Sequence, residues 1–208
     1  MYKPKEKNMK KVLLTSVVAT MATFASHAGV SPYAAMHIGY TNPNAMVSVG
    51  ECDYTAAELF SDKFAYDVSG AFGVKYGLSR DFALRGEVEY DYVEGFVFSV
   101  LGYWQRSHTV LANAYIDFKT ATALTPYFGG GVGYQFNHIS IEIDELGTTP
   151  SSVAWQVGGG IAYDVTDALT VDLGYRYLVS AEKYEESGYN YKFITGYNQF
   201  RLGASYTF

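Results

Sequence analysis

The chain has 208 residues, of which 17% are charged and 17% are aromatic, and it contains a single cysteine. This length is that of one domain, and one cysteine excludes a fold held together by internal disulfides. The formal net charge of −6 argues against nucleic acid as a partner.

The N-terminus has the parts of a secretory signal peptide. Two lysines precede an apolar run at residues 12–25, and Ser26-His27-Ala28 then places small residues where a signal peptidase cleaves. A buried or membrane-spanning helix is disfavoured because the run is short and is followed by glycine and proline. We expect residues 1–28 to be removed, with Met9 as an alternative translation start, and residues 29–208 to form the mature barrel. Removal of five lysines and one glutamate shifts the net charge from −6 to −10.

After the signal peptide, apolar and polar positions alternate over eight segments. In residues 67–78 the even positions hold Val, Gly, Phe, Val, Tyr and Leu, whereas the odd positions hold Asp, Ser, Ala, Gly, Lys and Gly. A period of two over this length predicts β-strands whose two faces lie in different surroundings. The expected strands lie near residues 33–40, 67–78, 82–92, 109–118, 127–136, 153–163, 169–177 and 200–208.

Two kinds of β-protein show such alternation. A soluble sandwich or barrel buries its apolar face, whereas a membrane barrel turns that face to lipid. No Lys, Arg, Asp or Glu occupies the apolar register of the predicted strands. Aromatic residues also recur near strand ends, for example at Tyr76, Phe82 and Trp155, as in the interfacial girdles of membrane barrels. The membrane barrel is therefore favoured.

Short and long links alternate between the predicted strands. The short links lie at 79–81, 119–125 and 165–168, and the long ones at 41–66, 93–107, 137–152 and 179–197. This order predicts an all-β fold, an eight-stranded antiparallel up-and-down transmembrane β-barrel. It has tight periplasmic turns and four long outer loops, and its closure pairs the backbone amides inside lipid.

The last eight residues carry the most specific motif. Arg201, Gly203, Tyr206 and Phe208 match the polar, glycine and two aromatic positions of the C-terminal signal that the outer-membrane assembly machinery reads. With "LTPYFGGGVGYQF" at 124–136, "LANAYIDF" at 111–118 and "LTVDLGYRYL" at 169–178, the chain resembles the opacity-protein and OmpA-like family of small outer-membrane barrels, often described as porin-like surface antigens. The resemblance implies a bacterial outer-membrane location and contact with lipid and lipopolysaccharide. Functions in this family lie in loops and lumens, not in the fold itself.

Charged residues also occupy the inward register of the predicted strands. They are Lys75, Arg85, Glu87, Glu89, Asp91, Asp117, Asp172, Arg176 and Arg201. The interior of an eight-stranded barrel is just wide enough for side chains to fill it. These charges therefore form either a salt-bridged plug, which is favoured because opposite charges attract strongly in a narrow lumen, or the lining of a small gated pore for ions or small solutes.

Three of the four expected outer loops, the first, third and fourth, are acidic and aromatic. Tyrosine-rich loops on a rigid scaffold suit contact with proteins or glycans. We expect a structural or adhesion role, with host or envelope proteins as partners of the loops. Cys52 in the first loop has no partner for an internal disulfide, and its role stays open.

An enzymatic alternative rests on His138 and Ser140. This His-x-Ser pair resembles the pair of the outer-membrane lipid A deacylases, in which a histidine base and a serine nucleophile hydrolyse an ester. Either Glu142 or Glu145 is a candidate to orient His138, but the Asn-Ala-Gly that usually follows in that family is absent. A lipid esterase is thus an alternative and a non-enzymatic protein the first expectation. No metal site or cofactor is expected, because the other histidines of the mature chain sit on separate strands.

Overall fold

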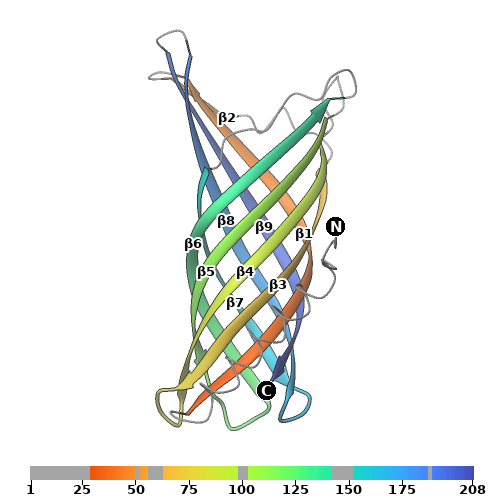
Figure 1. The fold of residues 1–208 in the computed structure, drawn as a ribbon, viewed down its shortest axis with the longest axis vertical. Helices are drawn as coiled ribbons and strands as arrows, with labels where there is room; N and C mark the ends of the chain where they lie inside the picture. Colours follow the sequence, from red (N-terminus) through yellow and green to blue (C-terminus); the bar gives the residue numbers. More distant parts are fainter. Residues whose placement is uncertain (1–28, 50–51, 56–62, 98–102, 142–151, 187–188) are drawn as a thin grey trace, which may run out of the picture.

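A computed structural model describes residues 29–49, 52–55, 63–97, 103–141, 152–186 and 189–208, with side chains described over slightly shorter ranges (Figure 1). The predicted signal peptide, residues 1–28, lies outside these ranges and stays a prediction. The strands are Val30–Val49 (β1), Cys52–Thr55 (β2), Lys63–Gly77 (β3), Phe82–Val97 (β4), Tyr103–Phe118 (β5), Leu124–Ile141 (β6), Ser152–Asp164 (β7), Leu169–Glu186 (β8) and Tyr189–Thr207 (β9).

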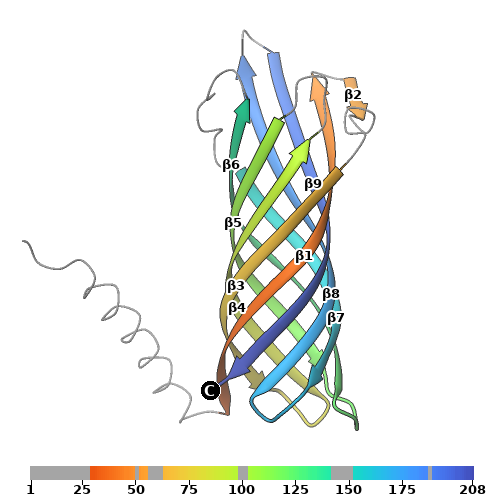
Figure 2. The same ribbon diagram turned by 90° about the vertical axis from the view of Figure 1, so that its right-hand side faces the viewer.

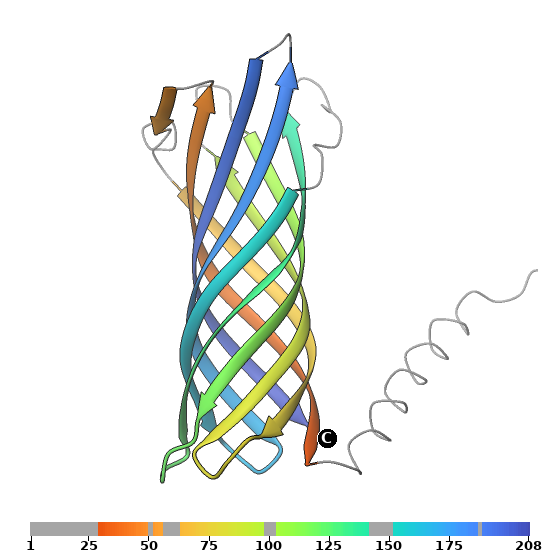
Figure 3. The ribbon, with the colours of Figure 1, turned by 90° about the vertical axis from the view of Figure 1, so that its left-hand side faces the viewer.

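Eight strands form the closed antiparallel barrel that the sequence predicts. Neighbours pair in the order β1-β3-β4-β5-β6-β7-β8-β9, and β9 pairs back onto β1 from Tyr33↔Thr207 to Val49↔Tyr191. Figures 2 and 3 show the strong tilt of the strands against the long axis, which closure of a sheet requires. The remaining strand, β2, pairs only with the outer end of β1 and is not part of the barrel wall.

The strands are longer than predicted at the end that carries the long loops. β1 continues to Val49 and β6 to Ile141, and the β8–β9 pairing continues to Glu186↔Tyr189. Most of the predicted fourth loop is therefore a hairpin, and β2 lies within the predicted first loop. The reason is physical: backbone pairing continues beyond the lipid, but the apolar alternation that predicted the strands ends where lipid contact ends.

Side-chain hydroxyls hold the short turns. Ser79 Oγ accepts hydrogen bonds from the backbone N–H groups of Asp81 (3.2 Å) and Phe82 (3.1 Å). Thr166 Oγ1 does the same for Ala168 (3.3 Å) and Leu169 (2.9 Å). Such bonds satisfy donors that the sheet leaves unpaired, which keeps these connections short.

The two faces of the wall have opposite character. Large apolar side chains point outward, with Met36 68%, Leu173 67% and Val132 64% exposed, whereas the charged Asp67 and Glu89 are fully buried inside. An apolar exterior around a polar interior is the arrangement of a barrel in lipid, so the core of this protein is its lumen. Within the described ranges, no helix has the length and hydropathy needed to span a bilayer.

Candidate functional site

An ion cluster fills the middle of the lumen. Arg176 on β8 contacts Glu89 (Nη1–Oε2, 2.9 Å) and Asp91 (Nη2–Oδ2, 2.8 Å) on β4. Arg201 on β9 contacts the same Glu89 (Nη2–Oε1, 2.5 Å) and Asp67 on β3 (Nε–Oδ2, 3.3 Å). All five side chains are buried, and the three carboxylates are 0% exposed. We call these five residues the central ion cluster.

Neutral polar groups add hydrogen bonds to the central ion cluster. Asn113 Nδ2 donates to Glu89 at 2.8 Å, Thr41 Oγ1 donates to Asp67 at 2.9 Å, and the Gln199 side-chain oxygen accepts from Arg176 Nε. Buried charges are tolerated only where they are paired and hydrogen-bonded. The cluster therefore ties together β1, β3, β4, β5, β8 and β9 across the lumen.

A mainly apolar layer adjoins the central ion cluster and extends from it toward the loops. It consists of Leu111, Ala154, Leu178 and Tyr197, all buried and in mutual contact. Leu178 is two residues nearer to the loops than Arg176 on the same strand. Gln135 Nε2 donates to the Tyr197 hydroxyl at 3.2 Å, which anchors the ring across the lumen. A charged layer and an adjoining apolar layer thus cross the interior.

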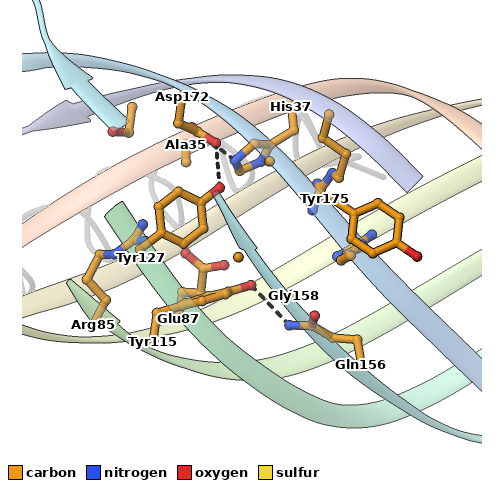
Figure 4. Close-up of a pocket in the computed structure, with 15 residues that line it drawn as sticks. Ala35, His37, Arg85, Glu87, Tyr115, Tyr127, Gln156, Gly158, Asp172 and Tyr175 are labelled. Carbon is orange, nitrogen blue, oxygen red and sulfur yellow. Dashed lines mark hydrogen bonds and ion pairs between the residues drawn. The ribbon is translucent and has the colours of Figure 1, made fainter. Parts of the chain in front are cut away.

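The periplasmic half of the lumen holds two carboxylates with neutral hydrogen-bond donors. The Tyr33 hydroxyl donates to Glu87 at 2.5 Å, and Asn113 Nδ2 donates to the same carboxylate at 3.2 Å. The Tyr127 hydroxyl donates to Asp172 at 2.9 Å. Figure 4 shows Glu87, Tyr127 and Asp172 around one pocket, together with His37.

A second group of charges lies closer to the periplasmic end. Arg85 Nε donates to Asp117 Oδ1 at 2.8 Å, and Lys75 Nζ is 3.9 Å from the other oxygen of Asp117. The Arg85 guanidinium also lies 5.0 Å from the ring centre of Tyr115 and 4.7 Å from that of Tyr127. Contact with both rings fixes the position of Arg85 by cation–π attraction.

Two small cavities lie in this half of the lumen. The larger, about 40 Å³, is lined by His37, Glu87, Asp172 and other polar groups, and the smaller, about 20 Å³, lies beside Lys75 and Asp117. Arg85, Asp172 and Ser205 line both. A cavity needs roughly 10–15 Å³ per water molecule, so these spaces suit a few waters and not an organic substrate.

Inward glycines make room for the tyrosines. A Cβ atom at Gly129 would lie 2.4 Å from Tyr115 Cδ1, and one at Gly174 would lie 2.6 Å from the Tyr127 hydroxyl. The glycine-rich polar register of the sequence thus has a packing explanation, because a narrow barrel can hold large rings only opposite positions without side chains.

The structure groups the predicted inward charges into distinct contacts. Glu89, Asp91, Arg176 and Arg201 meet in the central ion cluster, Lys75, Arg85 and Asp117 meet near the periplasmic end, and Glu87 and Asp172 line the larger cavity. The interior also contains residues that were not predicted as site residues from the sequence, among them Asp67, His37, Tyr33, Tyr115, Tyr127 and Tyr197. Asp67 could have been predicted, because it is a charged residue in the inward register of its strand. The tyrosines carry no charge that would have distinguished them in the sequence.

The C-terminal motif divides between the two faces of β9. Arg201 and Gly203 point into the lumen, while Tyr206 and Phe208 are exposed on the outside, with ring centres 5.4 Å apart. The Phe208 N–H donates to the Pro32 carbonyl oxygen at 3.0 Å and secures the strand end on β1. Recognition of this motif by the assembly machinery stays a prediction.

The candidate esterase residues lie at the outer end of β6. His138 pairs in the backbone with Arg106, and Ser140 with Trp104, so both belong to a strand and not to the predicted loop base. Their side chains and all of Glu142 and Glu145 lie outside what the structure describes, as does the side chain of Cys52 at the start of β2. Among the described residues, no group of three or more His, Cys, Asp and Glu could hold a metal ion.

Comparison with known proteins agrees with this architecture. The model of the family described as outer membrane protein β-barrel domain matches residues 11–208. The outer membrane protein PagN of Salmonella typhimurium is 32% identical over 120 residues, half of each chain, and an uncharacterised protein of Brucella abortus is 28% identical over 152 residues, 56% of this chain and 54% of its own. The chain spans about half the length of these relatives.

A solved structure shares the fold. The crystal structure of Neisserial surface protein A superposes with a TM-score of 0.58 over 86% of this chain and 99% of that one, at 16% sequence identity. At so low a sequence identity, the likeness establishes only that the two proteins share a fold.

Proposed function

This chain belongs to the outer membrane protein β-barrel domain family, and from that premise we propose that it acts as a closed, non-enzymatic barrel that displays its outer loops at the cell surface. Its location is the bacterial outer membrane. The role of the barrel is then mechanical: it holds the loops on a rigid wall, where they contact host or envelope proteins or stabilise the envelope.

The observation that carries the proposal is the double layer across the lumen. The central ion cluster joins opposite walls through Arg176 and Arg201, which share Glu89. The apolar layer with Leu111 and Leu178 adjoins this cluster, and both leucines are at most 1% exposed. An ion that crosses would have to separate buried charge pairs and then pass between closely packed, largely apolar side chains, and both steps are costly.

Planar-bilayer recordings test the closed lumen. Purified full-length protein, inserted into a bilayer under salt on both sides, is expected to give no steady conductance. Insertion is verified in parallel by the heat-dependent shift of the folded barrel on a denaturing gel. A steady conductance from verified, inserted protein would overturn the plug.

Loop replacement tests the contact role. Residues 142–151, in the acidic predicted third loop, are replaced by a Gly-Ser segment of equal length, and the matched control replaces the periplasmic residues 120–123 in the same way. Bacteria that display equal amounts of each protein are compared for binding to host cells and for envelope integrity. We expect the loop variant alone to lose binding or integrity. Equal behaviour of both variants and the wild type would argue against a function in this loop.

A small gated pore is the second candidate, and the two polar cavities favour it. Together they extend a polar path from the Lys75 region toward the central ion cluster. Among the described residues that are buried in the lumen or line these cavities, seven carboxylates (Asp67, Glu87, Glu89, Asp91, Asp117, Asp164 and Asp172) face four cations (Lys75, Arg85, Arg176 and Arg201). If the same recordings gave brief openings, this excess would make them cation-selective.

A further inference from the structure

A charged pair lies on the outside of the barrel wall. Glu94 on β4 and Arg106 on β5 are cross-strand neighbours, and Arg106 Nε lies 3.0 Å from Glu94 Oε1. Within the part of the wall whose side chains are described, they are the only charged residues in the outward register of the strands. The sequence predicted no charge there, because its strands ended before these two positions.

The pair lies at the membrane boundary on the loop side. The next outward row toward the periplasm contains Tyr92, His108 and Phe136 as cross-strand neighbours. The rings of Tyr92 and His108 are in contact, with centres 5.1 Å apart. Aromatic rows of this kind mark the head-group region of a membrane barrel. Arg106, one row nearer to the loops, therefore lies at the head-group level of the outer leaflet.

The neighbours of Arg106 orient its guanidinium. Glu94 accepts from Arg106 Nε through one oxygen and from the Tyr66 hydroxyl, at 2.5 Å, through the other. This chain of bonds fixes Nε and leaves the two Nη groups without an ion-pair partner among the described residues. The Arg106 side chain is 53% exposed, whereas that of Glu94 is only 17% exposed. The cation is thus presented outward while the carboxylate stays behind it.

We infer that Arg106 binds a phosphate group of lipid A in the outer leaflet. The outer leaflet consists of lipopolysaccharide, whose lipid A anchor carries its phosphates at the head-group level. A guanidinium offers two parallel N–H groups to a phosphate, and such charge-assisted pairs are strong and specific in geometry. The site faces sideways toward lipid, so it is independent of whether the lumen conducts or the loops adhere.

Native mass spectrometry of the detergent-solubilised full chain tests this site. The probe is lipid A with two phosphates, and the comparison lipids are chemically dephosphorylated lipid A and phosphatidylglycerol. The main variant is Arg106→Gln. A second variant, Arg106→Lys, keeps the positive charge but lacks the two parallel N–H groups of a guanidinium. The matched control is Arg80→Gln, which removes an exposed arginine from a periplasmic turn. The heat-dependent gel shift verifies that every variant is folded.

The expected results separate a site from general attraction. Arg106→Gln weakens the affinity for lipid A by about tenfold, Arg106→Lys by less, and Arg80→Gln leaves it unchanged. Dephosphorylated lipid A binds the wild type as weakly as lipid A binds Arg106→Gln. Equal affinity of Arg106→Gln and the wild type, an equal loss in Arg80→Gln, or equally tight binding of phosphatidylglycerol or dephosphorylated lipid A would overturn the inference.

Discussion

His37 on β1 and Asp172 on β8 meet over a glycine of the strand between them. His37 Nε2 lies 3.5 Å from Asp172 Oδ1, and Gly203 on β9 is the backbone neighbour of both residues. A Cβ atom at Gly203 would lie 2.3 Å from Asp172 Oδ1 and 2.3 Å from His37 Cδ2. The glycine of the C-terminal motif therefore has a packing role in the lumen, apart from any role in assembly.

The first prediction concerns this glycine. Gly203→Ala is expected to destabilise the barrel by about 1–3 kcal/mol, because the methyl group forces His37 and Asp172 apart in a filled lumen. The measurement is urea unfolding of protein refolded into lipid vesicles without assembly machinery, which isolates packing from recognition. Gly70→Ala is the control, since nothing lies within 4 Å of a Cβ at Gly70. Equal stability of the two variants would contradict the packing role.

The second prediction concerns the shared carboxylate of the central ion cluster. Glu89→Gln leaves Arg176 and Arg201 short of counter-charge in a buried site, and we expect a loss of about 3–5 kcal/mol in the free energy of unfolding. The control is Glu94→Gln on the same strand, which weakens an ion pair with the exposed Arg106 and should cost far less. Vesicle-based urea titration of both variants makes the comparison. Similar losses of unfolding free energy in the two variants would mean that the buried ion pairs of Glu89 do not stabilise the barrel more than the exposed pair does.

The third prediction separates the apolar layer of the lumen from the apolar exterior. Leu111→Ala should lower the free energy of unfolding by about 2–5 kcal/mol, because the cavity left in the lumen cannot collapse. Leu173→Ala removes the same atoms from an outward position that is 67% exposed, where acyl chains fill the space. Its loss should be clearly smaller in the same titration. A larger loss of unfolding free energy at Leu173 than at Leu111 would contradict this prediction, because it would mean that the lumen collapses around the cavity left at Leu111.

The fourth prediction tests the lipid contact of the outer wall. Val88, 60% exposed on β4, faces the middle of the apolar band. Val88→Arg should destabilise the inserted barrel by about 2–4 kcal/mol, because a cation then lies deep in hydrocarbon. Val165→Arg makes the same chemical change in a periplasmic turn and should be tolerated. Insertion yield into vesicles and urea unfolding provide the measurement, and equal tolerance would place Val88 outside the lipid.

The sequence by itself determined the wall of this protein. A period of two, an apolar row without charges and alternating short and long links leave few folds open, because each backbone group in lipid must find a partner inside a closed sheet. The same register identified the inward charges at Glu89, Arg176 and Arg201. Strand ends were missed where pairing continues past lipid, because beyond the lipid no alternation is required.

Only the tertiary structure decided which inward groups meet. Glu89 and Arg201 are 112 residues apart in sequence, and no local pattern links them. Their contact depends on barrel closure and on the tilt of the strands, which bring positions far apart in the chain to the same level of the lumen. For the same reason the place of His37 over Gly203, and of Arg106 beside Glu94 at the membrane boundary, followed from cross-strand register and not from either strand alone.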